Sequence, residues 1–249
     1  MRFTKSIAGA LLLAATAIST PAFAQDETEA PDAFTITGSA TVVSDYRFRG
    51  FSQTNEDSTI QGGFTVAHES GVYVGTWGSG IGFGQALGGN GTEIDVFAGF
   101  AKEVTSGLTV DVGATLYLYP GISDSTIIEP YLSLTGTVGP ATIKGGLAWA
   151  PKGQDSLGDF SSVYAYTDAA VGIPNTPVKL KAHLGYAKSD SFLGGLDGEV
   201  FDYSFGAEVS WKALTLGVSY VNTDETTALG WKDTIGADGA VLFTLGAAF

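Results

Sequence analysis

The segment at residues 35–53, TITGSATVVSDYRFRGFSQ, alternates between two kinds of side chain along its length. One parity is apolar or small and ends in two aromatics: Ile36, Gly38, Ala40, Val42, Ser44, Tyr46 and Phe48. The other parity carries hydroxyl groups and ends in one carboxylate and two guanidinium groups: Thr35, Thr37, Ser39, Thr41, Val43, Asp45, Arg47 and Arg49. A period of two over this length indicates a β-strand. We expect the first strand of a transmembrane β-barrel, with its apolar parity toward lipid and its charge cluster in the lumen.

The N-terminal segment has the features of a secretory signal peptide. Arg2 and Lys5 precede a short apolar run at 7–18, and a small-x-small cleavage site ends at Ala24. A transmembrane anchor is the alternative, but a spanning helix needs about 20 apolar residues. The acidic, proline-containing segment that follows predicts a disordered periplasmic tail. The chain therefore divides into a signal peptide, a tail and an outer-membrane barrel, at 1–24, 25–33 and 34–249.

Composition supports an exported barrel and argues against several other classes of protein. The chain has no cysteine, which removes disulfides and thiolate chemistry. Its net charge of −14 makes nucleic acid an unfavourable partner. The 35 glycines, the 12% aromatic content and the lack of a long apolar run in the mature part are typical of an outer-membrane barrel. A soluble exported β-sandwich is the alternative.

Eleven further segments alternate in the same way, at 59–68, 72–80, 93–104, 108–119, 127–138, 142–150, 162–172, 178–187, 200–211, 214–221 and 239–249. Most have about ten residues, the length that a tilted strand needs to cross a bilayer. Short connections alternate with longer ones, at 69–71, 105–107, 139–141, 173–177 and 212–213, as in barrels with short periplasmic turns. We therefore predict an all-β fold, a single up-and-down antiparallel barrel of about twelve strands with both termini in the periplasm. Only 72–80 leaves the inward parity open.

Eight charged residues of the predicted strands fall on the parity that faces the lumen: Asp95, Asp111, Glu129, Lys144, Lys179, Lys181, Asp202 and Glu208. This agrees with the cost of a charge on the lipid side, about 2–4 kcal/mol at the midplane. The candidates for a pore lining or constriction are Asp45, Arg47, Arg49, Asp95, Asp111, Glu129, Lys144, Lys179, Lys181 and Glu208. Inward glycines leave space in this lumen, at Gly99, Gly113, Gly146, Gly206 and Gly217. Opposite charges across a narrow lumen favour small polar solutes; a salt-bridge network that plugs the barrel is the alternative.

The motif DYRFRGFSQ at 45–53, with Phe51 at its variable position, carries a family resemblance. Together with the signal peptide, the glycine-rich alternating strands and the C-terminal Phe249, it resembles the TorF-type (Gcw_chp) porin family of Gram-negative outer-membrane proteins. The terminal aromatic also resembles the signal used by the barrel assembly machinery. The resemblance implies an outer-membrane location and a barrel fold, and it supplies no catalytic residues.

An outer-membrane lipid hydrolase is the rival from another class. Such an enzyme needs a nucleophile, a base and an orienting group in contact. The chain has two histidines, His68 at a predicted turn and His183 on a strand, and a serine for His183 would have to come from a neighbouring strand. Separated histidines without cysteine also lack metal-ligand spacing. We expect no enzyme activity, no catalytic residues, no metal and no cofactor.

The sequence thus predicts a porin of the Gram-negative outer membrane that lets small polar or charged solutes diffuse through a narrow charged lumen. A non-conducting structural or adhesive barrel is the second interpretation. The expected partners are outer-membrane lipid and lipopolysaccharide, a small-molecule solute and the barrel assembly machinery, with no nucleic acid. The transported solute, the pore radius and the formation of a homo-oligomer are left open.

Overall fold

The computed structural model describes residues 33–83, 89–225 and 236–249. The predicted signal peptide and all but the last residue of the predicted tail lie outside the described residues. The described residues form fourteen strands: β1 (Phe34–Val43), β2 (Arg47–Phe48), β3 (Phe51–Ser52), β4 (Thr59–His68), β5 (Val72–Gly80), β6 (Thr92–Thr105), β7 (Leu108–Leu118), β8 (Ile127–Val138), β9 (Ala141–Ala150), β10 (Ser162–Gly172), β11 (Val178–Ser189), β12 (Glu199–Trp211), β13 (Leu214–Thr223) and β14 (Ala240–Ala248). A short 3₁₀ helix, η1 (Phe192–Gly194), lies between β11 and β12.

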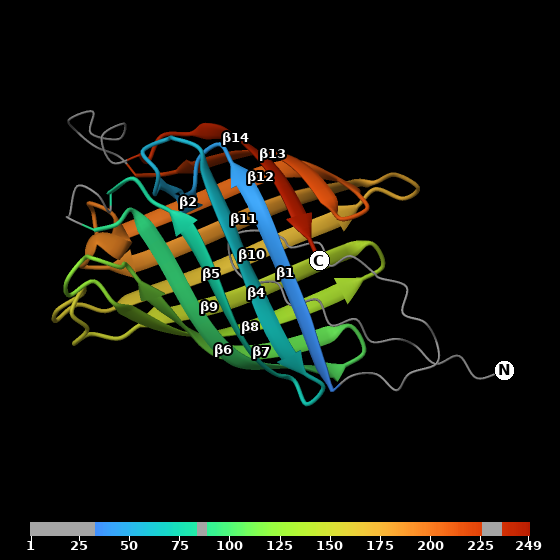
Figure 1. The fold of residues 1–249 in the computed structure, drawn as a ribbon, viewed down its shortest axis with the longest axis horizontal. Coiled ribbons are helices and arrows are strands. Elements are labelled where there is room, and N and C mark those ends of the chain that lie inside the picture. The colour runs from blue at the N-terminus through green and yellow to red at the C-terminus, as the bar shows by residue number, and fades with distance from the viewer. Residues whose placement is uncertain (1–32, 84–88, 226–235) are drawn as a thin grey trace.

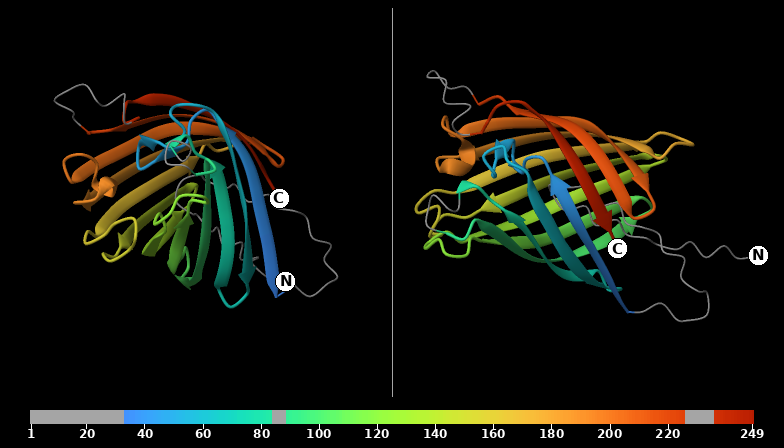
Figure 2. Two further views of the ribbon diagram at one scale, coloured as in Figure 1. Left: turned by 60° about the vertical axis from the view of Figure 1, so that its left-hand side comes forward. Right: turned by 45° about the horizontal axis from the view of Figure 1, so that its top comes forward.

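Twelve of these strands form one closed antiparallel barrel in the order β1-β14-β13-β12-β11-β10-β9-β8-β7-β6-β5-β4 (Figures 1 and 2). The prediction of a single up-and-down barrel of about twelve strands is confirmed. Each barrel strand pairs with the next barrel strand along the chain, so that β1 pairs with β4. The first and last strands, β1 and β14, pair with each other and close the barrel. In this arrangement every barrel strand has a hydrogen-bonded partner on both sides, as a wall without water requires.

The last residue of the chain extends the closing ladder. The backbone N–H of Phe249 donates to the carbonyl of Gly38 at 2.9 Å, and the N–H of Gly38 donates to the carbonyl of Phe249 at 2.7 Å. A Cβ on residue 38 would lie 2.7 Å from the Phe249 ring, so only glycine leaves room for that ring. The C-terminus therefore lies beside β1, at the end of the barrel with the short turns (Figure 1).

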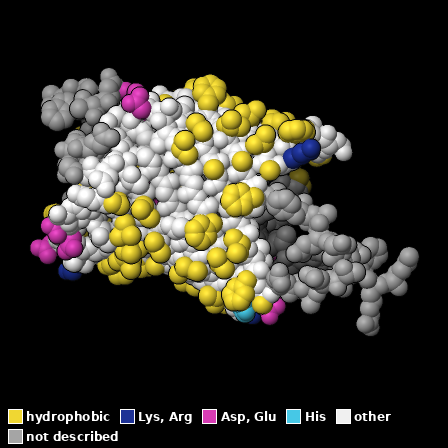
Figure 3. All heavy atoms as spheres, in the orientation of Figure 1, with side chains coloured by type: hydrophobic (Ala, Val, Ile, Leu, Met, Phe, Trp, Pro, Cys, Tyr) yellow, Lys and Arg dark blue, Asp and Glu magenta, His cyan; other side chains and the backbone are white. Residues whose placement is uncertain are grey.

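The outer surface of the barrel is apolar between its two ends. Side chains more than half exposed include Ile60, Phe64, Leu147, Phe205 and Phe243. On the face drawn in Figure 3, hydrophobic side chains cover the middle and the charged ones lie at the ends. Among the described residues, no helix is long and apolar enough to cross a bilayer.

The strand β5 resolves the parity that the sequence left open. Tyr73 is 1% exposed and faces inward, whereas Val72 and Val74 are exposed on the outside. The inward glycines do not all leave open space, as the sequence had suggested. The ring of Tyr73 lies over Gly99, and the hydroxyl of Tyr131 would lie 2.6 Å from a Cβ on residue 113. Tyrosine rings thus fill part of the space that neighbouring glycines provide.

The predicted first strand is too long. β1 ends at Val43, and Ser44 makes the last contact with β14, donating its N–H to the carbonyl of Phe243 at 2.9 Å. Beyond this point the chain leaves the wall and turns into the barrel, although the alternation of side chains continues. Tyr46 and Phe48, predicted to face lipid, are buried and half-buried inside.

Candidate functional site

Residues 45–54 fold back on themselves inside the barrel and are called the inner hairpin below. Arg47 pairs with Ser52 and Phe48 with Phe51, which leaves Arg49 and Gly50 as a two-residue turn. Both turn residues have positive φ, 49° and 85°, as a type I′ hairpin requires. In Figure 1, β2 lies at the end of the barrel that carries the long loops.

Asp45 holds the inner hairpin together. One of its carboxylate oxygens accepts from Arg47 Nε at 2.5 Å, and the other accepts from the hydroxyls of Ser52 at 2.6 Å and Thr54 at 2.8 Å. The guanidinium of Arg47 also donates to the carbonyl of Gly236 at 2.7 Å, which ties the hairpin to the segment before β14. Arg47 and Asp45 are both buried. Their opposite charges therefore neutralise each other within the hairpin.

Arg49 fixes the tip of the hairpin to the far wall. Its Nη2 donates to Glu129 on β8 at 2.5 Å, and its guanidinium carbon lies 4.2 Å from the ring centroid of Tyr164 on β10. Burial on its own lowers the pKa of Arg49, but the Glu129 carboxylate raises it, and the net shift is upward. The guanidinium therefore stays charged, in a buried pair strengthened by the aromatic face.

Two of the three aromatics of the inner hairpin, Tyr46 and Phe48, pack against the other side of the lumen. The Tyr46 hydroxyl donates to Glu93 on β6 at 2.8 Å, and its ring meets Trp77 on β5 edge-on at 5.3 Å. Phe48 meets Tyr117 on β7 at 6.0 Å. Together with the contacts of Arg49, these place the hairpin across the lumen between strands β5 and β10. The hairpin narrows the barrel at the end with the long loops.

A cavity of about 440 Å³ lies below the inner hairpin. Nine of the ten predicted pore residues line it: Asp45, Arg47, Arg49, Asp95, Asp111, Glu129, Lys144, Lys181 and Glu208. Lys179 is not among the lining residues, but its ammonium pairs with Glu208 at 3.2 Å.

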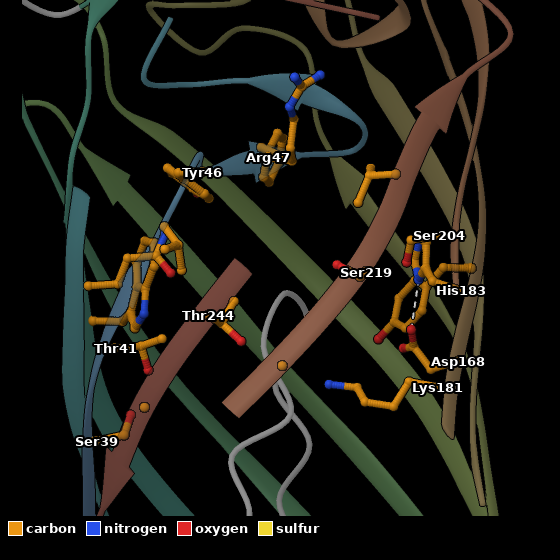
Figure 4. A pocket seen from close by; sticks show the side chains of 18 of the residues that line it. Ser39, Thr41, Tyr46, Arg47, Asp168, Lys181, His183, Ser204, Ser219 and Thr244 are labelled. Carbon is orange, nitrogen blue, oxygen red and sulfur yellow. Dashed lines mark hydrogen bonds and ion pairs between the residues drawn. The ribbon is translucent and has the colours of Figure 1, made fainter. Parts of the chain in front are cut away.

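The cavity has two chemically different walls. Apart from Asp45 and Tyr46 of the inner hairpin, its carboxylates, lysines and tyrosines come from strands β6 to β12. Strands β13, β14, β1 and β4 contribute uncharged residues such as Thr215, Thr244, Thr41 and Thr65. Figure 4 shows this division, with Ser39, Thr41 and Thr244 apart from Asp168, Lys181 and His183. A solute in the cavity would meet hydroxyl groups on one side and charged and aromatic groups on the other.

His183 lies in a network on the charged wall. Its Nδ1 is 2.7 Å from Asp168 Oδ1 and its Nε2 is 3.0 Å from Asp202 Oδ1. The Tyr164 hydroxyl also lies 2.9 Å from Nε2, so both ring nitrogens already have partners. Ser204 is the register partner of His183 on β12, yet within the described part of the chain no hydrogen bond joins the two. This arrangement leaves His183 no free nitrogen with which to activate the serine.

Several lumenal residues were not among the sequence candidates. They are Glu93, Tyr164, Tyr166, Asp168, His183 and Asp202, together with the misassigned Tyr46 and Phe48. For the strand residues the signal was available, since all lie on the inward parity of neighbouring strands. The inner hairpin had a weaker signal, an Arg-Gly pair in which Gly50 suits the positive φ of a turn.

Comparison with known proteins identifies a family and a fold. A family model described as a bacterial protein of unknown function (Gcw_chp) matches residues 27–249. Among curated proteins, no sequence matches at a significant level.

Three solved structures illustrate the likeness in fold. The NanC porin is 10% identical, with a TM-score of 0.58 over 86% of this chain and 99% of its own. The KdgM porin, which has also been solved in complex with disordered oligogalacturonate, is 9% identical, with a TM-score of 0.56 over 86% and 98%. An outer membrane channel from Pseudomonas putida F1 is 11% identical, with a TM-score of 0.52 over 89% and 99%.

Proposed function

The chain belongs to the Gcw_chp family, and we propose that it is an outer-membrane porin through which small polar solutes diffuse passively. The observation that carries this proposal is the cavity beneath the inner hairpin, which charged and hydroxyl-bearing residues help to line and which lies inside a barrel with an apolar outer surface. A barrel that served only as an anchor would gain nothing from charged groups such as Asp111, Lys144 and Lys181 around an unfilled interior. The porin fold of the solved neighbours agrees with this proposal.

The location follows from the same proposal. We infer that the predicted signal peptide exports the chain, that the barrel assembly machinery inserts it, and that lipid and lipopolysaccharide contact its apolar surface. The end with the short turns then faces the periplasm, and the inner hairpin lies toward the outside. A solute entering from outside would meet the hairpin first and the two-walled cavity second.

In this proposal the inner hairpin restricts the size of the solute. Arg47 and Arg49 were candidates for the cationic side of a constriction, but each is neutralised by a carboxylate at 2.5 Å. Their main role is therefore to hold the hairpin in place. The remaining candidates, which include Asp95, Lys144 and Lys181, face the solute and set its charge preference.

The charges that line the cavity disfavour anionic solutes. The cavity is lined by seven carboxylates, from Asp45, Asp95, Asp111, Glu129, Asp168, Asp202 and Glu208, against four lysines and arginines and one histidine. A polyanion such as the oligogalacturonate of the KdgM complex would meet an excess of like charge here. We therefore propose neutral or cationic solutes of small size.

Reconstitution into planar bilayers tests the proposal. The purified chain should produce discrete conductance steps, and liposomes that contain it should swell in small sugars faster than in large ones. A correctly folded protein that produces neither would overturn the porin and favour the non-conducting structural barrel.

A further inference from the structure

Asp95 is a buried carboxylate without a hydrogen-bonding or ionic partner in the part of the chain that the structure describes. It lies on β6, is 9% exposed and lines the cavity. Within residues 33–83, 89–225 and 236–249, neither of its carboxylate oxygens accepts a hydrogen bond or forms an ion pair, and Oδ1 is fully covered. Burying an unpaired carboxylate is costly, so such a group is either neutral or paired with something that the chain does not supply.

The neighbour Glu93 adds to the local negative charge. It faces inward on the same strand, is 2% exposed and accepts a hydrogen bond from Tyr46. No cationic side chain of the described residues forms an ion pair with Glu93 or Asp95. The other lumenal acids differ, because Glu129 pairs with Arg49, Asp168 with His183, and Glu208 with two lysines.

Aromatic rings surround Asp95. Trp77 on β5 and Tyr117 on β7 are its register partners on either side, so all three side chains project from the same inner face. The inner hairpin adds Tyr46 against Trp77 and Phe48 against Tyr117. Each of these four rings also lines the cavity. The unpartnered carboxylate therefore lies at the centre of an aromatic wall.

This combination is the chemistry that recognises an ammonium group. A cation gains from the faces of Trp and Tyr rings and from a desolvated carboxylate. A metal ion fits less well, because no group of three carboxylates or imidazoles suitable for one occurs among the described residues. We propose that Asp95, with Trp77, Tyr46 and Tyr117, forms a binding site for an organic ammonium cation in the lumen. An organic ammonium cation would then be a solute of the proposed porin. The site rests on the porin function only for the route by which the cation reaches the lumen.

Asp111 shows that a lumenal aspartate does not by itself make such a site. It lies on the adjacent strand β7 and also lines the cavity, but its carboxylate accepts a hydrogen bond from Tyr73 at 2.6 Å. Tyr73 in turn shares a hydrogen bond with Tyr131. The aromatic residues around Asp111 thus satisfy the carboxylate, whereas the carboxylate of Asp95 receives no such hydrogen bond.

Calorimetry on the purified full-length chain in detergent tests the site, with choline chloride as the probe and sodium chloride at equal concentration as the reference. The wild type should bind choline. D95N should weaken binding at least tenfold, because it removes the charge and keeps the shape. W77L should also weaken binding, because it keeps the charge and removes a ring face. D159N makes the same charge change in an exposed loop and should bind choline like the wild type.

The outcomes separate this inference from the proposed function. Equal binding by the wild type and a folded D95N, or no binding by the wild type, would overturn the ammonium site even if the protein conducts. Choline binding that depends on Asp95 in a protein without conductance would support the site and overturn the porin. A band that migrates fast on an unheated gel and slowly after heating shows that a variant is folded.

Discussion

Arg49 links the inner hairpin to the opposite wall through a buried ion pair with Glu129. Its side chain and that of Glu129 are both 6% exposed, so R49A would leave the buried carboxylate without its cation, with only the hydrogen bond from the Tyr117 hydroxyl at 3.1 Å. Breaking a buried pair in this way costs roughly 3–5 kcal/mol. We expect the hairpin to detach, with a larger and noisier single-channel conductance in planar bilayers. R49K should have an intermediate effect, since lysine keeps the charge but loses the planar stack on Tyr164.

K152A provides the control for this prediction, because it removes a cation from an exposed loop residue. It should leave the conductance unchanged. If R49A conducts like the wild type, then the contact with Glu129 does not hold the hairpin. A shift in ion selectivity without a change in conductance would instead support the original interpretation of Arg49 as a selectivity residue.

A substitution at Gly50 tests the turn of the inner hairpin without changing any charge of the hairpin. Its φ of 85° is unfavourable for any residue with a Cβ, and an added Cβ would overlap the methyl group of Thr223 and lie 3.2 Å from the Cβ of Asp202. G50A should therefore displace the hairpin tip and raise the conductance in the same direction as R49A. G153A is the matched control, since Gly153 also has φ of 85° but has open space around it. A larger effect of G153A than of G50A would contradict this account.

The inner hairpin as a whole should be dispensable for folding. Val43 and Thr59 are register partners, so an Asn-Gly turn can join β1 directly to β4 in place of residues 44–58. The twelve-stranded wall stays closed in this variant, and we expect it to insert. Its conductance should rise several-fold, and liposome swelling should extend to larger sugars. Unchanged size exclusion would show that the narrowest point lies elsewhere in the lumen.

The closing strand pair makes a different prediction. Removing Phe249 deletes two backbone hydrogen bonds to Gly38 and the ring that covers it. Each unpaired backbone group costs roughly 1–3 kcal/mol. The truncated chain should therefore fold in lower yield in lipid vesicles, as measured by the fraction of protein that migrates fast on unheated gels. F243A, which removes an exposed outward ring from the middle of β14, should have a smaller effect.

The sequence predicts the strands of the barrel wall better than it predicts the residues that lie inside the lumen. Lipid outside and water inside impose a period of two on each strand, and a slip of one residue would move every charge into hydrocarbon. The inner hairpin escapes this rule because both of its faces are inside. Its alternation continues that of β1, and nothing in the pattern marks Ser44 as the point where the chain leaves the wall. The pairing of Arg49 with Glu129, 80 residues away, depends on strand order and register that only the closed barrel fixes.

The charge of the whole lumen leads to the last prediction. The seven carboxylates that line the cavity outnumber the four lysines and arginines, and counting His183 as a cation still leaves an excess of two negative charges. A potassium chloride gradient across a bilayer should therefore give a reversal potential that favours potassium over chloride. Because the Debye length falls from about 10 Å at 0.1 M salt to about 3 Å at 1 M, the preference should weaken as salt rises. Chloride preference at low salt would contradict the net negative charge that the lining residues give the lumen.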